Sequence, residues 1–202
     1  MNHHLLVILI AISLLFISCN SGRQKTNFPV EKEFSLDSSV LGVSTIATEL
    51  DVPWEITWGP DNWIWLTEQK GVISKINPET GEKKILLHVP AVYKERTLGL
   101  LGMAVYPDFD KFPYVFVDYT FLRDSIRFSR IVRYIYSKDT LTAPYILLDN
   151  IAGNTGHNGS RLAITPDRKL IISTGDALKG ENTQNKNSFN GTVLRVNIDG
   201  AI

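Results

Sequence analysis

The sequence predicts an all-β fold, and two observations support this prediction. Beyond about residue 40, no long stretch repeats apolar residues at the spacing of a helix, whereas short runs of β-branched and aromatic residues recur. Turn residues separate these runs at intervals of about eight to twelve positions, as in sheets built from short strands. With 44% hydrophobic residues, the chain also has enough apolar material for a packed core.

The first residues precede the folded part. The apolar run from Leu5 to Ser18 is too short to cross a bilayer of about 30 Å as a helix, and we interpret residues 1–18 as a signal peptide. Cys19 follows at once and resembles the lipidated cysteine of bacterial lipoproteins. It is the only cysteine, so none is left for disulfides, catalysis or metal binding. We expect residues 19–42 to form a flexible tether that anchors the domain of residues 43–202 to the bacterial cell envelope, facing the periplasm or the exterior.

A repeat organises the folded part. Three Pro-Asp pairs, at residues 60–61, 107–108 and 166–167, have the chemistry of turns rather than of a catalytic site. They recur about 47 and about 59 positions apart, the size of a propeller blade with a loop. We therefore expect about three blades and, because a closed propeller needs at least four, the N-terminal part of a longer protein. The strands expected within the repeat cover residues 62–67, 71–77, 114–121, 130–136, 161–165, 170–175 and 192–197.

A polar insertion distinguishes the third copy of the repeat. Residues 176–190 have no counterpart in the first copy, and long polar loops on one face of a repeat scaffold are frequent binding sites. His157 precedes the first strand of this copy, and Asp176 follows its second strand. If residues 162–164 and 170–174 form a hairpin, the imidazole and the carboxylate lie side by side at one end of the blade.

This pair has two interpretations. In the first, the carboxylate of Asp176 fixes the tautomer of His157, which removes a hydroxyl proton as a carbon centre is oxidised. In the second, His157 is a structural or solvent-facing residue of a turn rich in glycine and asparagine. The charges favour a small or neutral ligand over nucleic acid, because Lys and Arg balance Asp and Glu at 21 each.

Several segments carry a resemblance to a known family. The run "GLLGMAVYPDF" and the pairing of "HNGSRL" with "STGDA" are similar to the soluble quinoprotein, PQQ-dependent glucose and aldose sugar dehydrogenases, and the similarity extends from about Leu50 onward. The resemblance implies a six-bladed β-propeller that binds pyrroloquinoline quinone and calcium at one end of its channel. It also implies that His157 is the general base while hydride passes to the quinone, and that Asp176 orients the histidine.

The same resemblance suggests where a sugar binds and what else takes part. The substrate-binding candidates are Thr97, where the family often has glutamine, Gly156, where glucose-oxidising members often have an acid, and Asn158 and Arg161. The basic residues that hold the quinone and the calcium ligands are implied to lie in later blades, so we assign no metal ligand here. A periplasmic electron acceptor, such as a cytochrome or a quinone, is the implied partner.

Two other functions stay open. Thr97 and Gly156 are compatible with a propeller lipoprotein that binds glycans or proteins without catalysis. A lactonase-type propeller would need several acidic ligands for a metal-bound water, and of these only Asp176 is well placed. Trp54 and Glu55, in the segment "VPWEI", are the best candidates for an exposed role in binding.

Overall fold

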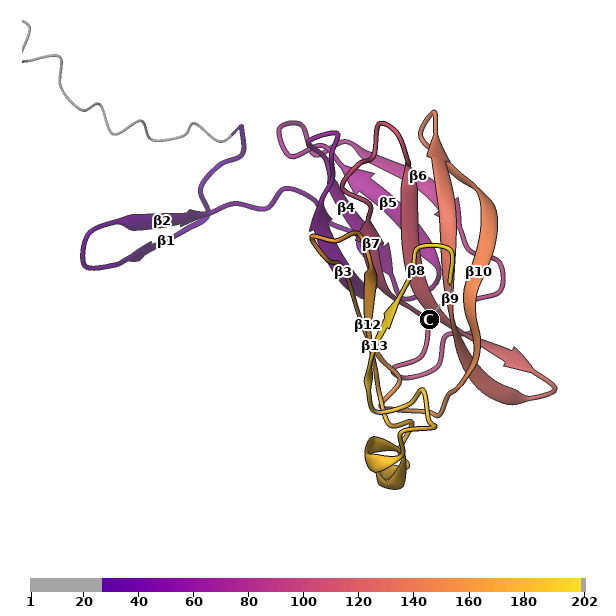
Figure 1. Ribbon diagram of the computed structural model, residues 1–202. Coiled ribbons are helices and arrows are strands. Elements are labelled where there is room, and N and C mark those ends of the chain that lie inside the picture. Colours follow the sequence, from indigo (N-terminus) through magenta and orange to yellow (C-terminus); the bar gives the residue numbers. More distant parts are fainter. Residues whose placement is uncertain (1–26, 201–202) are drawn as a thin grey trace, which may run out of the picture.

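The computed structural model describes residues 27–200, which form a series of antiparallel β-sheets (Figure 1). The first four-stranded sheet contains β3 (Pro53–Trp58), β4 (Ile64–Glu68), β5 (Val72–Ile76) and β6 (Lys83–His88). The second contains β7 (Leu100–Val105), β8 (Tyr114–Arg123), β9 (Ile126–Ser137) and β10 (Thr140–Ala152). The third has three strands, β11 (Gly159–Ile164), β12 (Leu170–Thr174) and β13 (Val193–Val196), and a 3-10 helix, η1 (Gly180–Gln184), precedes β13.

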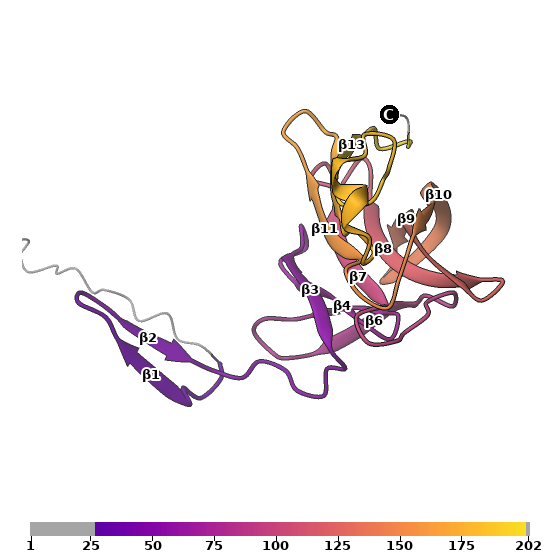
Figure 2. The same ribbon diagram turned by 90° about the horizontal axis from the view of Figure 1, so that it is seen from below.

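The three sheets are consecutive blades. Within each sheet the strands pair in the order of the sequence, so the first strand of each blade lies at an edge. The first strands also meet one another, because β7 contacts both β3 and β11 (Figure 2). The prediction of an all-β fold with about three propeller blades is therefore confirmed for the described residues.

The core lies in two layers, one on each side of the second blade. One layer packs residues such as Trp65 and Ile73 of the first blade against Val115 and Val117 of β8. The other packs Phe116 of β8 and residues of β9 and β10 against the third blade. Since successive side chains of a strand point to opposite faces, β8 supplies both layers, and its apolar run follows from burial on both sides.

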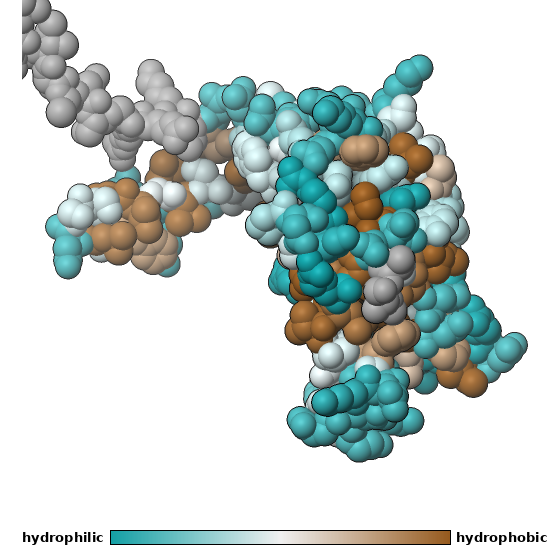
Figure 3. Space-filling model, in the orientation of Figure 1, coloured by the Kyte–Doolittle hydropathy of each residue, from teal (hydrophilic) through white to brown (hydrophobic). Residues whose placement is uncertain are grey.

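The expected strands agree with the observed ones. Every range predicted from the sequence overlaps a strand of the structure, and β9 is longer than the expected range 130–136. Each Pro-Asp pair lies in the connection between the first and second strands of a blade, as its turn chemistry predicted. The insertion, residues 176–190, contains η1 and projects from the third blade. It forms the hydrophilic lower end of the molecule in Figure 3.

A further hairpin precedes the blades. Strands β1 (Lys32–Ser35) and β2 (Val40–Val43) pair with each other, and their residues are exposed. These strands lie within or beside the range expected to be a tether, and the sequence analysis did not predict them. The apolar run before Ser18 and the predicted lipidation site Cys19 lie outside the described residues. Within the described part of the chain, no helix has the length and apolar character needed to cross a membrane.

Candidate active site

The loop that carries His157 is shaped by its own asparagines. Asn158 is buried, and its side chain donates to the carbonyl oxygen of Asn154 at 2.8 Å and accepts from the amide of Asn154 at 2.9 Å. Asn154 in turn donates from Nδ2 to the carbonyl oxygen of Ala177 at 2.9 Å. These bonds satisfy the polar groups of an irregular segment and join it to the residue that follows Asp176. Asn158 thus helps to shape the loop, and its predicted role in binding substrate stays a prediction.

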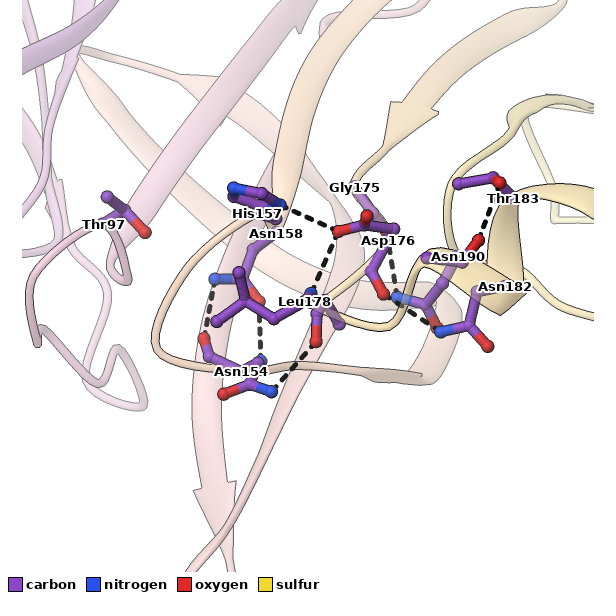
Figure 4. Close-up of polar contacts among 12 residues, drawn as sticks. Thr97, Asn154, His157, Asn158, Gly175, Asp176, Leu178, Asn182, Thr183 and Asn190 are labelled. Carbon is purple, nitrogen blue, oxygen red and sulfur yellow. Dashed lines mark hydrogen bonds and ion pairs between the residues drawn. The ribbon is translucent and has the colours of Figure 1, made fainter.

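His157 and Asp176 meet at the end of the β11–β12 hairpin (Figure 4). The Nδ1 atom of His157 lies 3.0 Å from Oδ1 of Asp176, and the same oxygen accepts from the amide of Leu178 at 2.9 Å. The side chain of His157 is 64% exposed, whereas that of Asp176 is 23% exposed. The side-by-side placement predicted from the hairpin is confirmed, and it presents the imidazole to solvent while its partner is held in the loop.

The backbone around the pair is tightly connected. His157 has a left-handed conformation with φ of 56°, and its carbonyl oxygen accepts from the amide of Ala177 at 2.9 Å. The insertion supplies two further bonds, from Asn182 Nδ2 to the carbonyl of Asp176 at 3.0 Å and from Asn190 Nδ2 to that of Gly175 at 3.2 Å. The insertion therefore helps to fix the main chain that presents the carboxylate.

An open cleft of about 590 Å³ adjoins the imidazole. Because most of the lining residues are small, a hydroxyl-bearing ligand would meet little steric hindrance there. The carboxylate contact favours the tautomer with the proton on Nδ1, which leaves Nε2 able to accept a proton from such a ligand. The lining residues are His157, Ser173, Thr174, Gly175, Asp176, Thr183, Gly191, Thr192 and Val193.

The other predicted substrate contacts lie at different distances from the pair. Thr97, in the loop before β7, donates to the carbonyl oxygen of Thr155 at 3.3 Å and so touches the His157 loop. A Cβ added to Gly156 would lie 3.6 Å from the nearest atom of Leu178, an ordinary contact, so the space there would admit a side chain. The guanidinium of Arg161 pairs with Glu55 of the first blade. Their roles in binding a substrate stay predictions.

Two carboxyl groups have environments that the sequence analysis did not foresee. Glu55, expected to be exposed, is buried, because the inward face of β3 packs toward the second blade. Asp118 is buried in the middle of β8, where the hydroxyl of Ser129 donates to it, and burial raises the pKa of Asp118 to about 6. The sequence did contain a signal for the burial of Asp118, because it is the one carboxyl group in the apolar run "YVFVDYTF".

No metal centre is formed within residues 27–200. No group of three or more histidine, cysteine, aspartate or glutamate side chains is arranged there to hold a metal ion. The polar residues of the site are instead engaged in fixing one imidazole and one carboxylate beside a cleft.

Fold and site together define a class: β-propeller proteins with a histidine–carboxylate pair at one end of the blades. Residues 50–202 match the model of the glucose/sorbosone dehydrogenase family, and the chain belongs to that family. The resemblance found in the sequence motifs is thereby confirmed.

Individual relatives agree with this assignment. The chain is 32% identical to quinoprotein glucose dehydrogenase B of Acinetobacter calcoaceticus over 237 aligned positions, which cover 100% of this chain and 48% of that protein. The PQQ-bound aldose sugar dehydrogenase of Streptomyces coelicolor superposes with a TM-score of 0.72 at 31% identity, covering 78% of this chain and 48% of that one. The apo-form of the soluble aldose sugar dehydrogenase of Escherichia coli, at 23% identity, shares the fold with a TM-score of 0.69 over 76% and 46% of the two chains. The chain thus spans about half the length of the relatives it matches.

Proposed function

We propose that the complete protein oxidises an aldose or a related sugar with pyrroloquinoline quinone, and that His157 is the general base. The observation that carries this proposal is the contact of 3.0 Å between His157 Nδ1 and Asp176 Oδ1 beside an open cleft. Membership of the glucose/sorbosone dehydrogenase family supplies the reaction class.

The residues of this chain handle the proton. A sugar hydroxyl in the cleft donates to Nε2 of His157, which takes up the proton as the carbon is oxidised. The carboxylate of Asp176 then stabilises the imidazolium through Nδ1–H, and the amide of Leu178 keeps that carboxylate in place. The quinone, when bound, supplies the two-electron acceptor that takes the hydride from the sugar.

The described residues fit this proton-handling role but offer little to hold an anionic cofactor. The walls of the cleft include no lysine or arginine, and the hydroxyls of Ser173 and Thr174 are engaged with main-chain groups. We therefore propose that the charged contacts to the quinone, and the ligands of an accompanying calcium ion, lie outside residues 27–200.

The sequence supports a location for this reaction. The apolar run before Ser18 and the following Cys19 favour a lipoprotein of the bacterial cell envelope, with a periplasmic cytochrome or quinone as electron acceptor. Growth with a labelled fatty acid tests the anchor: the wild-type protein should incorporate the label, and the Cys19→Ser variant should not.

A titration tests the proposed activity. The complete apo-protein, prepared without its lipid anchor, is titrated with pyrroloquinoline quinone and calcium while the absorbance of the quinone is followed, and a panel of aldoses is then added. Saturable binding followed by bleaching with a sugar is the expected result. A folded protein that binds glycans but no quinone would overturn the enzyme proposal in favour of a binding protein.

The His157→Ala variant tests the assigned base. Turnover should fall by about 10²–10⁴-fold, while quinone binding persists. His88→Ala is the matched control, because His88 lies at the end of β6 in the first blade and outside the cleft. Turnover of His157→Ala equal to that of His88→Ala would remove His157 from the mechanism.

A further inference from the structure

An ion pair joins the first blade to the third near the candidate site. Arg161 lies in β11, four positions after His157, and its Nη1 atom is 2.5 Å from Oε1 of Glu55 in β3. Strand β7 lies between β3 and β11 and contacts both. The side chain of Arg161 therefore reaches past the first strand of the second blade, at the edges where the three blades meet.

Glu55 is the fixed partner of this pair. It is buried, and the side chain of Arg161 is 64% exposed. Oε1 also accepts from the amide of Ile56 at 3.2 Å, whereas Oε2 is buried without a hydrogen-bond partner in the described part of the chain. Because a buried carboxylate is costly unless it is paired, the guanidinium is held against Glu55, and Arg161 is held with it.

Arg161 lies where the ladder between β11 and β12 is irregular. Gly159 pairs with Thr174 and Arg161 with Ser173, so the register shifts between these two pairs. At the shift, the amide of Arg161 donates to the hydroxyl of Ser173 at 3.0 Å, a side-chain bond. Ser173 and Thr174 lead directly to Gly175 and Asp176. At the start of β11, close to the His157–Asp176 pair, a side-chain bond thus accompanies the shift in the ladder.

We propose that the Glu55–Arg161 ion pair is a positioning device for the His157–Asp176 pair: it holds the irregular start of β11 in one register. This inference rests on the proposed function. Without the ion pair, the first residues of β11 shift relative to β12, and the contact between His157 Nδ1 and the carboxylate loosens. Displacement of a catalytic group by about 1 Å costs on the order of 10²-fold in rate.

Kinetics of the complete protein test the proposal with four variants: Glu55→Gln, Arg161→Gln, Arg161→Lys and, as the control, Arg168→Gln. Arg168 lies in the turn at the far end of the same hairpin and pairs with the exposed carboxylate of Asp108. The first two variants should lose about 10- to 100-fold in kcat with little change in KM. Arg161→Lys, which keeps the charge but not the planar fork, should recover part of the loss, and Arg168→Gln should match the wild-type protein.

A ring measurement separates this proposal from the proposed function. In protein labelled with ¹⁵N-histidine, the ring shifts of His157 report which nitrogen carries the proton, without any turnover. The Nδ1–H form should dominate in the wild-type protein and in Arg168→Gln, and it should lose that dominance in Glu55→Gln and Arg161→Gln. A wild-type protein that oxidises no sugar would contradict the proposed function alone, since the ring shifts still test the positioning role.

Two results would overturn the proposal. One is an unchanged His157 tautomer in both Glu55→Gln and Arg161→Gln. The other is a rise in KM with an unchanged kcat in Arg161→Gln, because that split would mean that the guanidinium contacts the sugar directly.

Discussion

A Cβ atom on Gly175 would lie 1.8 Å from the carbonyl oxygen of His157. Two non-bonded heavy atoms cannot lie this close together. The main chain at position 175 can therefore approach the main chain of His157 as it does only with glycine at that position. The close approach lets Asp176 follow directly, with its carboxylate in reach of the imidazole. The main chains of the two loops thus lie close enough for the two side chains to pair.

Gly175→Ala should therefore damage the site by displacing the His157 loop. We expect a loss of about 1–3 kcal/mol in the free energy of unfolding and a fall in kcat with it. The control is Gly180→Ala in the insertion, where an added Cβ meets nothing within 4 Å. Chemical denaturation and sugar turnover of both variants give the answer, and equal behaviour of the two would show that the loops have room to separate.

The charge of Asp176 should matter more than its shape. In Asp176→Asn the amide oxygen can still accept from Leu178, but the stabilisation of a protonated His157 is lost. We expect kcat to fall by about 10²–10⁴-fold while the thermal midpoint changes little. Asp167→Asn, an exposed turn position at the opposite end of the hairpin, should keep wild-type kcat. A small loss in Asp176→Asn would mean that the carboxylate only shapes the loop.

The sequence predicted the blades because their signals are local. Short β-branched runs and Pro-Asp turns depend only on residues that are close in the sequence. The placement of His157 beside Asp176 could be predicted for the same reason, because both residues flank a single hairpin, β11–β12. The Glu55–Arg161 pair joins residues 106 positions apart, so it depends on how separate blades pack. The burial of Glu55 was missed for the same reason: a strand pattern does not say which neighbouring blade covers a face.

Asp118 should make the stability of the protein fall as the pH rises. Burial raises the pKa of Asp118 from 3.8 to about 6, so the folded state holds this proton more tightly than the unfolded state does. The contribution of the Asp118 proton to the free energy of unfolding is fully present below pH 3.8, and it is lost as the pH rises to about 6. At about 1.4 kcal/mol per pKa unit, the loss is on the order of 3 kcal/mol.

Asp118→Asn isolates this contribution. The free energy of unfolding is measured by urea denaturation for the wild-type protein and for the variant at several values between about pH 4 and pH 7. Subtracting one curve of stability against pH from the other removes the effect of the titratable groups that both proteins share. The wild-type protein should lose on the order of 3 kcal/mol more than the variant over this range. Parallel stability curves would show that Asp118 is ionised in the folded protein throughout.

One buried lysine takes part in the contact between the first two blades, beside their shared apolar core. The Nζ atom of Lys75 lies 2.8 Å from Asp61 Oδ2 and 2.7 Å from Asp139 Oδ1, and it donates to the hydroxyl of Tyr136 at 2.9 Å. Burial alone would lower the pKa of Lys75, but the carboxylates of Asp139 and Asp61 raise it, so the ammonium stays charged. Lys75 and Asp61 belong to the first blade, and Tyr136 and Asp139 to the second, so the network joins the two blades beside their shared core.

Lys75→Met removes the ammonium and leaves both carboxylates without it. The side chain of Lys75 is 5% exposed, whereas the carboxylates of Asp61 and Asp139 that it leaves behind are 25% and 41% exposed and reach water. We therefore expect the free energy of unfolding to fall by roughly 1–2 kcal/mol, the size of lost hydrogen bonds between charged groups. Lys84→Met is the matched control: Lys84 also pairs with Asp139, but its side chain is 36% exposed, and water compensates for the loss of such a partner. Equal denaturation midpoints for the two variants would mean that the blades are joined by their apolar core alone, because burial of the ammonium would then add nothing to the contact.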